Sequence, residues 1–204
     1  MSIAIIDYGS GNLRSVQKAF QKFGFTAEIT KDKAAIRGAK GVVLPGVGSF
    51  DAALTELRHY GLEGAIEESI ALNKPFLGIC LGLQHLFDSS EEGKQRGLGI
   101  LKGRVVKFAP AEGLSVPHMG WNRLLIKHQS PLLAGINDGD MVYFAHSYHV
   151  VPEDKMAIAT TTDYGIEFVS AVRKGNLYGI QFHPEKSGEV GLRIVRNFGE
   201  LCSK

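Results

Sequence analysis

The chain has 204 residues, of which 44% are hydrophobic and 22% charged, and its formal net charge is +2. These values are typical of a globular domain and exclude long disordered, collagen-like or coiled-coil regions. The small net charge gives no electrostatic reason to expect a nucleic acid or an anionic membrane as partner. The two cysteines, Cys80 and Cys202, imply no disulfide framework. Glycine is overrepresented. The chain has 25 glycines in 204 residues, whereas the usual frequency of glycine is about 7%.

No targeting or membrane segment is predicted. The apolar run at residues 3–6 is too short for a secretory signal and has no basic start. No apolar stretch approaches the ~20 residues of a membrane span. We therefore expect a cytoplasmic protein. We also expect residues 1–204 to form a single domain, because neither repeats nor a linker divide the chain.

The first half of the chain alternates predicted strands with predicted helices. Short apolar runs predict strands, and apolar residues at helical spacing predict helices. The strands are expected at residues 3–6, 26–29, 41–44 and 75–79, with Pro45 ending the third, and the helices at 16–23, 52–57, 62–72 and 81–87. Such alternation implies crossover connections, and therefore a mostly parallel sheet with helices on both faces.

The second half has a different pattern. Its short apolar runs are separated by Gly, Asp, Asn and Pro, so they predict strands of which some are antiparallel. These runs occupy residues 105–108, 124–126, 141–144, 157–159, 168–172 and 177–180, and a closing helix is expected at 189–201. The predicted fold class is therefore α/β: an open, mostly parallel central sheet with helices on both faces, plus added antiparallel strands in the second half.

One cysteine has the sequence context of a nucleophile. Residues 78–82, Gly-Ile-Cys-Leu-Gly, follow a predicted strand and precede a predicted helix, as a nucleophile elbow requires. The sharp turn strains the backbone of the nucleophile, so the residues two positions away must be small. The N-terminus of the helix that follows favours the thiolate form of Cys80 and offers free backbone N–H groups to an oxyanion. The alternative is that Cys80 is a small buried core residue, the common fate of a free cysteine.

A cysteine nucleophile needs a base and a group that orients the base. Among seven histidines, spacing favours His183, which follows a predicted strand, while Pro184 ends that strand and Glu185 lies two residues on. A His-Pro-Glu turn places the carboxylate beside the imidazole and fixes its tautomer. Alone, this tripeptide is a weak signal that favours a surface turn. Together with the elbow it predicts a triad of Cys80, His183 and Glu185.

Three other patterns carry weaker signals. His146 and His149 could form a metal pair, but no Cys or carboxylate joins them, which favours a structural or substrate-contact role. Residues 9–12 suggest a phosphate loop but lack both the Walker lysine and the dinucleotide glycine spacing. Residues 45–48, Pro-Gly-Val-Gly, follow a strand at the sheet edge where ligands bind. Their paired glycines allow a peptide to flip and donate N–H groups.

Several of these motifs resemble the class I (triad) glutamine amidotransferases. The elbow with its surroundings, residues 74–84, and the segment 181–185 carry that resemblance. Further segments narrow it to the glutaminase subunits that serve histidine biosynthesis: residues 6–13, 45–50, 116–122, 143–148 and 183–187. The similarity extends from about residue 3 to about residue 201, and its combination of motifs is specific although each short piece is not.

The resemblance implies hydrolysis of L-glutamine to L-glutamate and ammonia, without a cofactor or metal ion. Cys80 would attack the amide, His183 would protonate the departing ammonia, and Glu185 would orient His183. The family's oxyanion donors correspond to Leu81 and to residues 45–48, here called the oxyanion segment, with Val47 donating after a rearrangement beside Gly48. Its glutamine-binding positions correspond to Gln84, Glu92, Ser147 and Tyr148.

The resemblance also implies a partner protein. In this family the ammonia passes to a (β/α)8-barrel cyclase that closes an imidazole ring, and the two chains form a heterodimer. Four residues lie in motifs that the family directs toward this partner: Asn12, Trp121, Tyr143 and Lys186. A barrel needs about 250 residues, so a 204-residue sequence predicts a separate glutaminase rather than the fused form.

Three alternatives remain open. A related amidotransferase subunit could serve anthranilate or aminodeoxychorismate synthesis, but residues 45–50 and 118–122 favour the histidine pathway. A non-catalytic scaffold of the same fold would not need all three triad residues. A cysteine hydrolase with a similar sheet should lack Gln84 and the His-Pro-Glu turn.

Overall fold

The computed structural model describes residues 2–9, 11–109 and 114–204. Within them the helices are α1 (Leu13–Gln21), α2 (Lys33–Gly38), α3 (Phe50–His59), α4 (Glu63–Ala71), α5 (Leu81–His85) and α6 (Gly188–Leu201). The strands are β1 (Ser2–Ile6), β2 (Thr26–Thr30), β3 (Gly41–Gly46), β4 (Phe76–Cys80), β5 (Ser89–Ser90), β6 (Gly103–Lys107), β7 (His118–Arg123), β8 (Leu125–Ile126), β9 (Met141–His146), β10 (Tyr148–Pro152), β11 (Ile158–Asp163), β12 (Glu167–Lys174) and β13 (Leu177–Ile180).

Eleven strands of the described residues form one sheet in the order β2-β1-β3-β4-β13-β12-β10-β6-β5, with β11 beside β12 and β8 beside β11. The pairs from β2 to β13 are parallel. From β13 to β6 they are antiparallel, as are the pairs that join β11 and β8 to the sheet. The strands β7 and β9 form a separate antiparallel pair. The predicted fold class is therefore confirmed.

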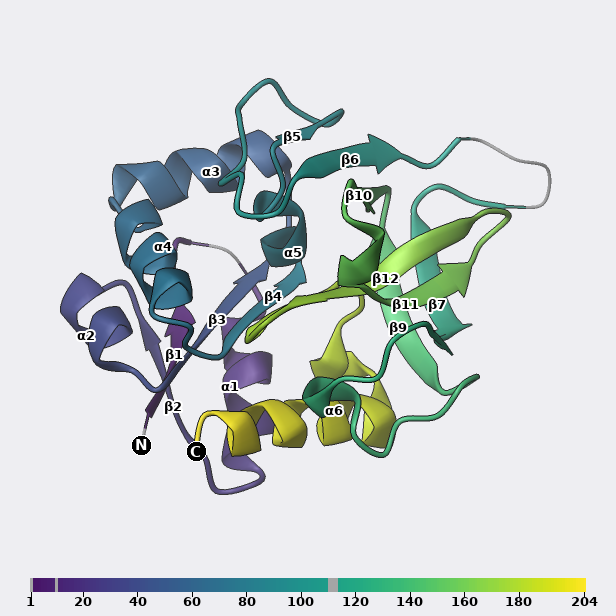
Figure 1. The fold of residues 1–204 in the computed structure, drawn as a ribbon. Helices are drawn as coiled ribbons and strands as arrows, with labels where there is room; N and C mark the ends of the chain where they lie inside the picture. The colour runs from purple at the N-terminus through teal and green to yellow at the C-terminus, as the bar shows by residue number, and fades with distance from the viewer. Residues whose placement is uncertain (1, 10, 110–113) are drawn as a thin grey trace.

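Helices cover both faces of the parallel part of this sheet (Figure 1). Alternate residues of a strand point to opposite faces. In β1, Ile3 and Ile5 accordingly pack with α1 and α6, whereas Ala4 and Ile6 pack with α2, α3 and α4. The two hydrophobic cores hold the parallel strands between them, and the carboxyl ends of these strands form the edge at which the candidate site lies.

Several local predictions differ from the structure. The prediction missed α2, a short helix that buries Ile36 and begins at Asp32, whose carboxylate accepts a hydrogen bond from Ala34 N–H. The strand β3 does not stop at Pro45 but continues to Gly46. A proline fits there because β1 pairs with β3 only as far as Val43, so no β1 ladder bond is lost. The polar strand β7 was also missed.

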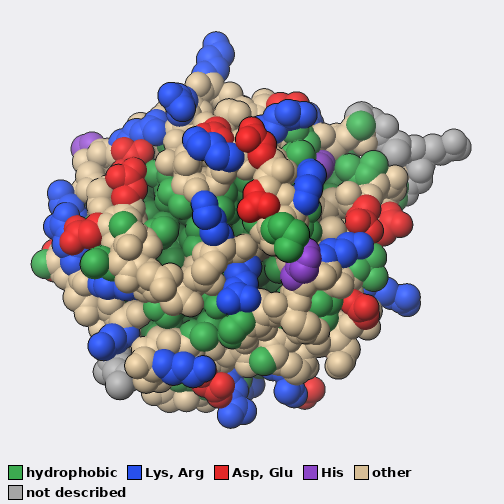
Figure 2. All heavy atoms as spheres, in the orientation of Figure 1, with side chains coloured by type: hydrophobic (Ala, Val, Ile, Leu, Met, Phe, Trp, Pro, Cys, Tyr) green, Lys and Arg blue, Asp and Glu red, His purple; other side chains and the backbone are tan. Residues whose placement is uncertain are grey.

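The surface mixes charges of both signs (Figure 2). Basic and acidic side chains alternate on the face in view, as expected from a net charge of +2. In the described parts of the chain, no helix combines the length and the apolarity needed to cross a bilayer.

Candidate active site

Cys80 lies at the point where β4 ends and α5 begins. Its backbone has φ 54° and ψ −107°, a region that L-residues with side chains rarely adopt. Such a conformation costs about 1–3 kcal/mol and persists only where the surrounding structure enforces it. Register pairs hold Ile79 between Pro45 of β3 and Ile180 of β13 on the two sides. The strained turn therefore sits at the end of a fully paired central strand.

Two glycines make this turn sterically possible. A Cβ atom at Gly78 would lie 2.8 Å from the carbonyl oxygen of Gly82, and one at Gly82 would lie 1.8 Å from the carbonyl oxygen of Leu44. Both contacts are with backbone, which cannot move aside as a side chain can. The positions two residues before and after Cys80 therefore accept only glycine without a backbone shift.

The side chains of His183 and Glu185 meet beside Cys80. The imidazole Nδ1 lies 2.9 Å from Glu185 Oε1, and both side chains are almost fully buried. Pro184–Lys186 form a short 3₁₀ turn that brings the two side chains together. The Cys80 side chain also acts on the charge of this ring. The three residues thus have the nucleophile, base and orienting carboxylate in the arrangement of a triad.

The charge state of His183 follows from these contacts. Burial lowers the pKa of His183, but the hydrogen bonds and charges of Cys80 and Glu185 outweigh it and raise this pKa to about 10. The imidazole is therefore protonated at neutral pH. A protonated ring beside the sulfur stabilises the negative charge of an attacking thiolate and carries a proton that a leaving amine can accept.

Asn12 contacts the triad directly. Its side-chain amide donates a hydrogen bond to Glu185 Oε1, the same oxygen that faces His183. Asn12 has a left-handed backbone (φ 72°) just before α1, a conformation that asparagine tolerates well. The resemblance assigned Asn12 to a partner surface, and the structure places its side chain against the carboxylate of the triad.

A cavity of about 220 Å³ opens beside Cys80. It is lined by every residue predicted for an oxyanion or glutamine contact: Val47, Gly48, Leu81, Gln84, Glu92, Ser147 and Tyr148. The structure thus brings together segments from four separate parts of the sequence. Leu81 is the first residue of α5, and the first N–H groups of a helix have no partner within it.

Gln84 lines this cavity and contacts a second glutamine side chain, that of Gln181. Gln84 Nε2 donates to the carbonyl of Tyr148 at 3.1 Å and to Gln181 Oε1 at 3.2 Å. Gln181 is fully buried, and its own Nε2 lies 3.6 Å from Cys80 Sγ. Gln181 was assigned no role from the sequence. A polar side chain in a predicted buried segment, two residues before His183, was a signal that could have identified it. Glu92, which was predicted to contact the substrate, accepts a hydrogen bond from Phe50 N–H at 3.0 Å, and this bond fixes the loop that carries Glu92.

The buried histidines of β7 and β9 form a neutral chain rather than a metal site. His146 Nδ1 lies 2.8 Å from the Tyr148 carbonyl and must therefore donate, so its Nε2 accepts from His118 Nδ1 at 3.1 Å. Burial lowers the pKa of His146 to about 3 and that of His118 to about 4. Within the described residues, no group of three His, Cys, Asp or Glu side chains could hold a metal ion.

Three of the residues predicted to face a partner lie side by side. Trp121 and Tyr143 are register partners in β7 and β9, with ring centroids 6.2 Å apart. Lys186 Nζ lies 5.9 Å from the centre of the Tyr143 ring. Trp121 is 52% exposed. The main-chain carbonyl of Tyr143 also accepts a hydrogen bond from His183 N–H at 2.9 Å, so this surface adjoins the triad.

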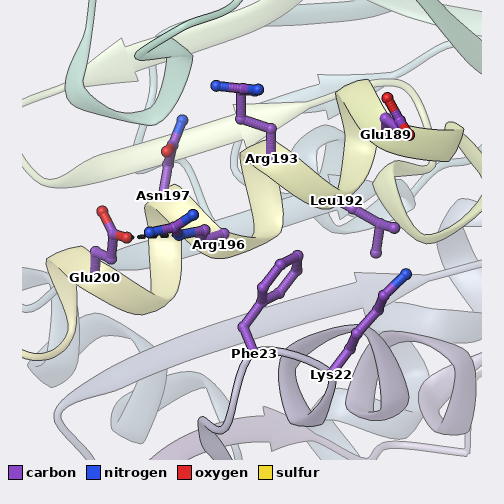
Figure 3. A pocket seen from close by; sticks show the side chains of 8 residues that line it. All are labelled: Lys22, Phe23, Glu189, Leu192, Arg193, Arg196, Asn197 and Glu200. Carbon is purple, nitrogen blue, oxygen red and sulfur yellow. Dashed lines mark hydrogen bonds and ion pairs between the residues drawn. The ribbon is translucent and has the colours of Figure 1, made fainter.

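A larger hollow of about 460 Å³ lies between the end of α1 and one side of α6 (Figure 3). It is lined by charged and polar side chains with two apolar ones: Lys22, Phe23, Glu189, Leu192, Arg193, Arg196, Asn197 and Glu200. Arg196 and Glu200 form an ion pair across its rim at 2.8 Å. None of these residues belongs to the triad or to the cavity beside Cys80, so this hollow is separate from the candidate active site.

Comparison with known proteins agrees with this site. A family model described as glutamine amidotransferase class-I matches residues 4–201. The chain therefore belongs to the class I glutamine amidotransferases. Its fold is shared by a solved glutamine amidotransferase (TM-score 0.77, 20% identity, 99% of each chain). It is also shared by PurLQS from Thermotoga maritima (TM-score 0.76, 20% identity, 97% of this chain and 96% of that one).

Several relatives of higher identity carry the name imidazole glycerol phosphate synthase subunit HisH. The relative from Syntrophotalea carbinolica is 51% identical, over 98% of this chain and 100% of its own length. That from Moorella thermoacetica is 52% identical, over 98% and 94%. That from Aquifex aeolicus is 48% identical, over 100% and 99%. The similarity therefore extends over essentially the whole of each protein.

Proposed function

We propose that this chain is the glutaminase subunit of an imidazole glycerol phosphate synthase. It hydrolyses L-glutamine to L-glutamate and ammonia and passes the ammonia to a separate (β/α)8-barrel cyclase, which forms imidazole glycerol phosphate and AICAR in histidine biosynthesis. The observation that carries the proposal is the strained Cys80 elbow beside a buried His183–Glu185 pair. The full-length relatives support the choice of pathway.

In the proposed mechanism, Cys80 Sγ attacks the side-chain amide carbon of glutamine. The negative charge that forms on the amide oxygen is stabilised by the N–H groups of Leu81 and, after the oxyanion segment rearranges, Val47. Protonated His183 gives its proton to the amide nitrogen, the C–N bond breaks, and ammonia leaves a glutamyl thioester on Cys80. Neutral His183 then removes a proton from water, which attacks the thioester, and glutamate departs as Cys80 is restored.

The size and the polar lining of the cavity are consistent with glutamine as the substrate. Its volume of about 220 Å³ suits a single amino acid, and Gln84, Glu92, Ser147 and Tyr148 offer polar groups around it. The proposal assigns these four residues to glutamine binding. It assigns the surface of Trp121, Tyr143 and Lys186, together with Asn12, to the heterodimer contact with the cyclase. We also propose that residues 1–204 form a single glutamine amidotransferase domain and that the protein is cytoplasmic.

A nitrogen-transfer assay tests the proposal against its rivals. Glutamine labelled with ¹⁵N in the side-chain amide is supplied to this chain together with the barrel cyclase and its nucleotide precursor. We expect the label in the imidazole ring of the product. A parallel reaction contains an anthranilate synthase large subunit and chorismate instead. Label that reaches anthranilate but not the imidazole would overturn the pathway, and glutamate release without Cys80 would overturn the mechanism.

A further inference from the structure

Tyr8 is a buried residue that neither the triad nor the glutamine cavity accounts for. It lies just after β1 and is 1% exposed. Its hydroxyl donates a hydrogen bond of 2.9 Å to the carbonyl oxygen of Pro45, the first residue of the oxyanion segment. A buried tyrosine hydroxyl usually has such a partner, but this partner is a main-chain group next to the peptides that would hold the oxyanion.

The Tyr8 hydroxyl donates a hydrogen bond where the pairing between β1 and β3 has ended. The strand β3 pairs with β1 only through Val43, whereas its pairing with β4 continues to Gly46 and Cys80. On its β1 side, therefore, the end of β3 is not paired with β1. A buried carbonyl left without a donor costs about 1–3 kcal/mol. Tyr8 supplies that donor from a side chain, so it fixes the end of β3 on the side that β1 leaves open.

The space around Gly46 shows how tightly this end is held. A Cβ atom on Gly46 would lie 2.3 Å from Tyr8 Oη, 3.0 Å from Leu81 Cβ and 3.2 Å from Gly82 N. Gly46 is thus enclosed between Tyr8 on one side and the Cys80 elbow on the other. The oxyanion segment is therefore held at its first two residues before it reaches Val47.

The other end of the segment is also anchored. Phe50, the first residue of α3, donates its N–H to Glu92 Oε2 at 3.0 Å. Its carbonyl lies 3.2 Å from His85 Nε2, which must donate because a carbonyl oxygen can only accept. Burial lowers the pKa of His85 to about 4, so the ring is neutral. The ring of His85 packs against both Phe50 and Tyr8. The two anchors are thus joined through one buried histidine.

The residues between the anchors have room to move. Val47 and Gly48 line the cavity beside Cys80 and also a second cavity of about 150 Å³ behind the segment, of which Tyr8 forms part of the wall. Gly48 has φ +102°, and a Cβ atom there would meet nothing within 4 Å. Val47 and Gly48 therefore form a thin wall between two cavities.

We propose that Tyr8 is a positioning residue for glutamine hydrolysis: its hydrogen bond to the Pro45 carbonyl fixes one pivot of the oxyanion segment. With this pivot fixed, rearrangement is confined to the Val47–Gly48 peptides and delivers an N–H to one place. The inference rests on the proposed function. A misplacement of about 1 Å can cost on the order of 100-fold in rate, and complete loss of an oxyanion donor costs about 10²–10³. Partial loss of position should therefore cost about tenfold.

The test is Tyr8→Phe, which removes only the hydroxyl. Tyr178→Phe is the matched control, because Tyr178 is equally buried but lies in β13, away from the oxyanion segment. Wild type and both variants are assayed for glutamate release in complex with the barrel cyclase and its nucleotide ligand, and their thermal unfolding is measured. We expect Tyr8→Phe to lower kcat about tenfold and to change KM less than threefold. We expect Tyr178→Phe to leave kcat within twofold of wild type.

Equal kcat for Tyr8→Phe and wild type would overturn the positioning role while leaving the proposed function intact. A loss that Tyr178→Phe shares, or that appears in KM alone, would also overturn it, since either would indicate a general packing effect. If the wild-type complex itself releases no glutamate, the proposed function fails instead.

Discussion

Two neighbouring segments line the cavity beside Cys80, and they are built in opposite ways. At the Cys80 elbow, a methyl group on Gly82 would approach the Leu44 carbonyl to 1.8 Å, and both neighbouring strands pair with β4 up to the turn. At the oxyanion segment, a methyl group on Gly48 would meet nothing, and cavities lie on both sides. The proposed nucleophile is closely packed, while the proposed oxyanion donor borders open space. Control of activity should therefore act on the second segment.

The largest expected effect at the Cys80 elbow is that of Cys80→Ala. Removing the nucleophile of a catalytic triad costs about 10⁶ in kcat in a well-studied protease, so we expect a loss of at least about 10⁴ in glutamate release. Binding to the cyclase should be unchanged, because the sulfur is buried. The measurement is a coupled glutamate assay alongside a titration with the cyclase. Turnover near that of wild type would refute the role of Cys80.

The steric basis of the elbow is tested by Gly82→Ala. The added methyl group collides with backbone, so we expect the free energy of unfolding to fall by about 3 kcal/mol or more. The control is Gly64→Ala, at an exposed helical position where the methyl group meets nothing. That change should raise stability by about 0.5–1 kcal/mol. Urea unfolding of both variants compares them, and similar effects at the two sites would contradict a locked elbow.

The His183–Glu185 pair predicts a specific pH dependence. The pKa of His183 in the folded protein is raised to about 10 from an ordinary 6.5, so its contribution to stability is complete below about pH 6.5 and is lost as the pH rises toward about 10. We expect Glu185→Gln to destabilise the protein more at pH 6 than at pH 10, by about 1 kcal/mol or more. Glu167→Gln, which removes an exposed ion pair with Lys127, is the control. Parallel pH profiles for wild type and Glu185→Gln would show that the pair does not stabilise the charged ring.

The smallest expected effect concerns the surface of Trp121, Tyr143 and Lys186, the proposed contact with the cyclase. Lys186→Ala should weaken stimulation by the cyclase several-fold and leave the melting temperature nearly unchanged, because exposed charges contribute about 0–1 kcal/mol to stability. Lys174→Ala, at the end of the distant strand β12, provides a comparison. Titration of glutaminase activity with the cyclase measures the effect. Unchanged stimulation in Lys186→Ala would remove this residue from the proposed contact.

The part of the site that could be predicted from sequence depends on local geometry. The elbow is readable because strand, glycines and cysteine are contiguous, and His183 and Glu185 are two residues apart. The strands of the parallel half are readable because burial on both faces gives continuous apolar runs. In contrast, β7 mixes Gly, Trp, Asn and Arg and has no run to detect.

Contacts between distant segments could not be predicted in this way. Asn12 and Glu185 are 173 positions apart, and Tyr8 and Pro45 are 37 apart. Neither contact follows from propensity or spacing, because each depends on how β1, β3 and the last helix pack. Gln181 shows an intermediate case: its polarity within a buried segment is visible, but its contact with Cys80 is not.

The central claim is that a fixed nucleophile awaits a movable oxyanion segment that the partner controls. The most direct test is the rate of glutamate release by the wild-type chain alone and by its complex with the barrel cyclase and nucleotide ligand. We predict that the complex raises kcat by tenfold or more, with a smaller change in KM, since a missing oxyanion donor costs about 10²–10³ in rate. Full activity of the chain alone, without any stimulation by the cyclase, would contradict the account.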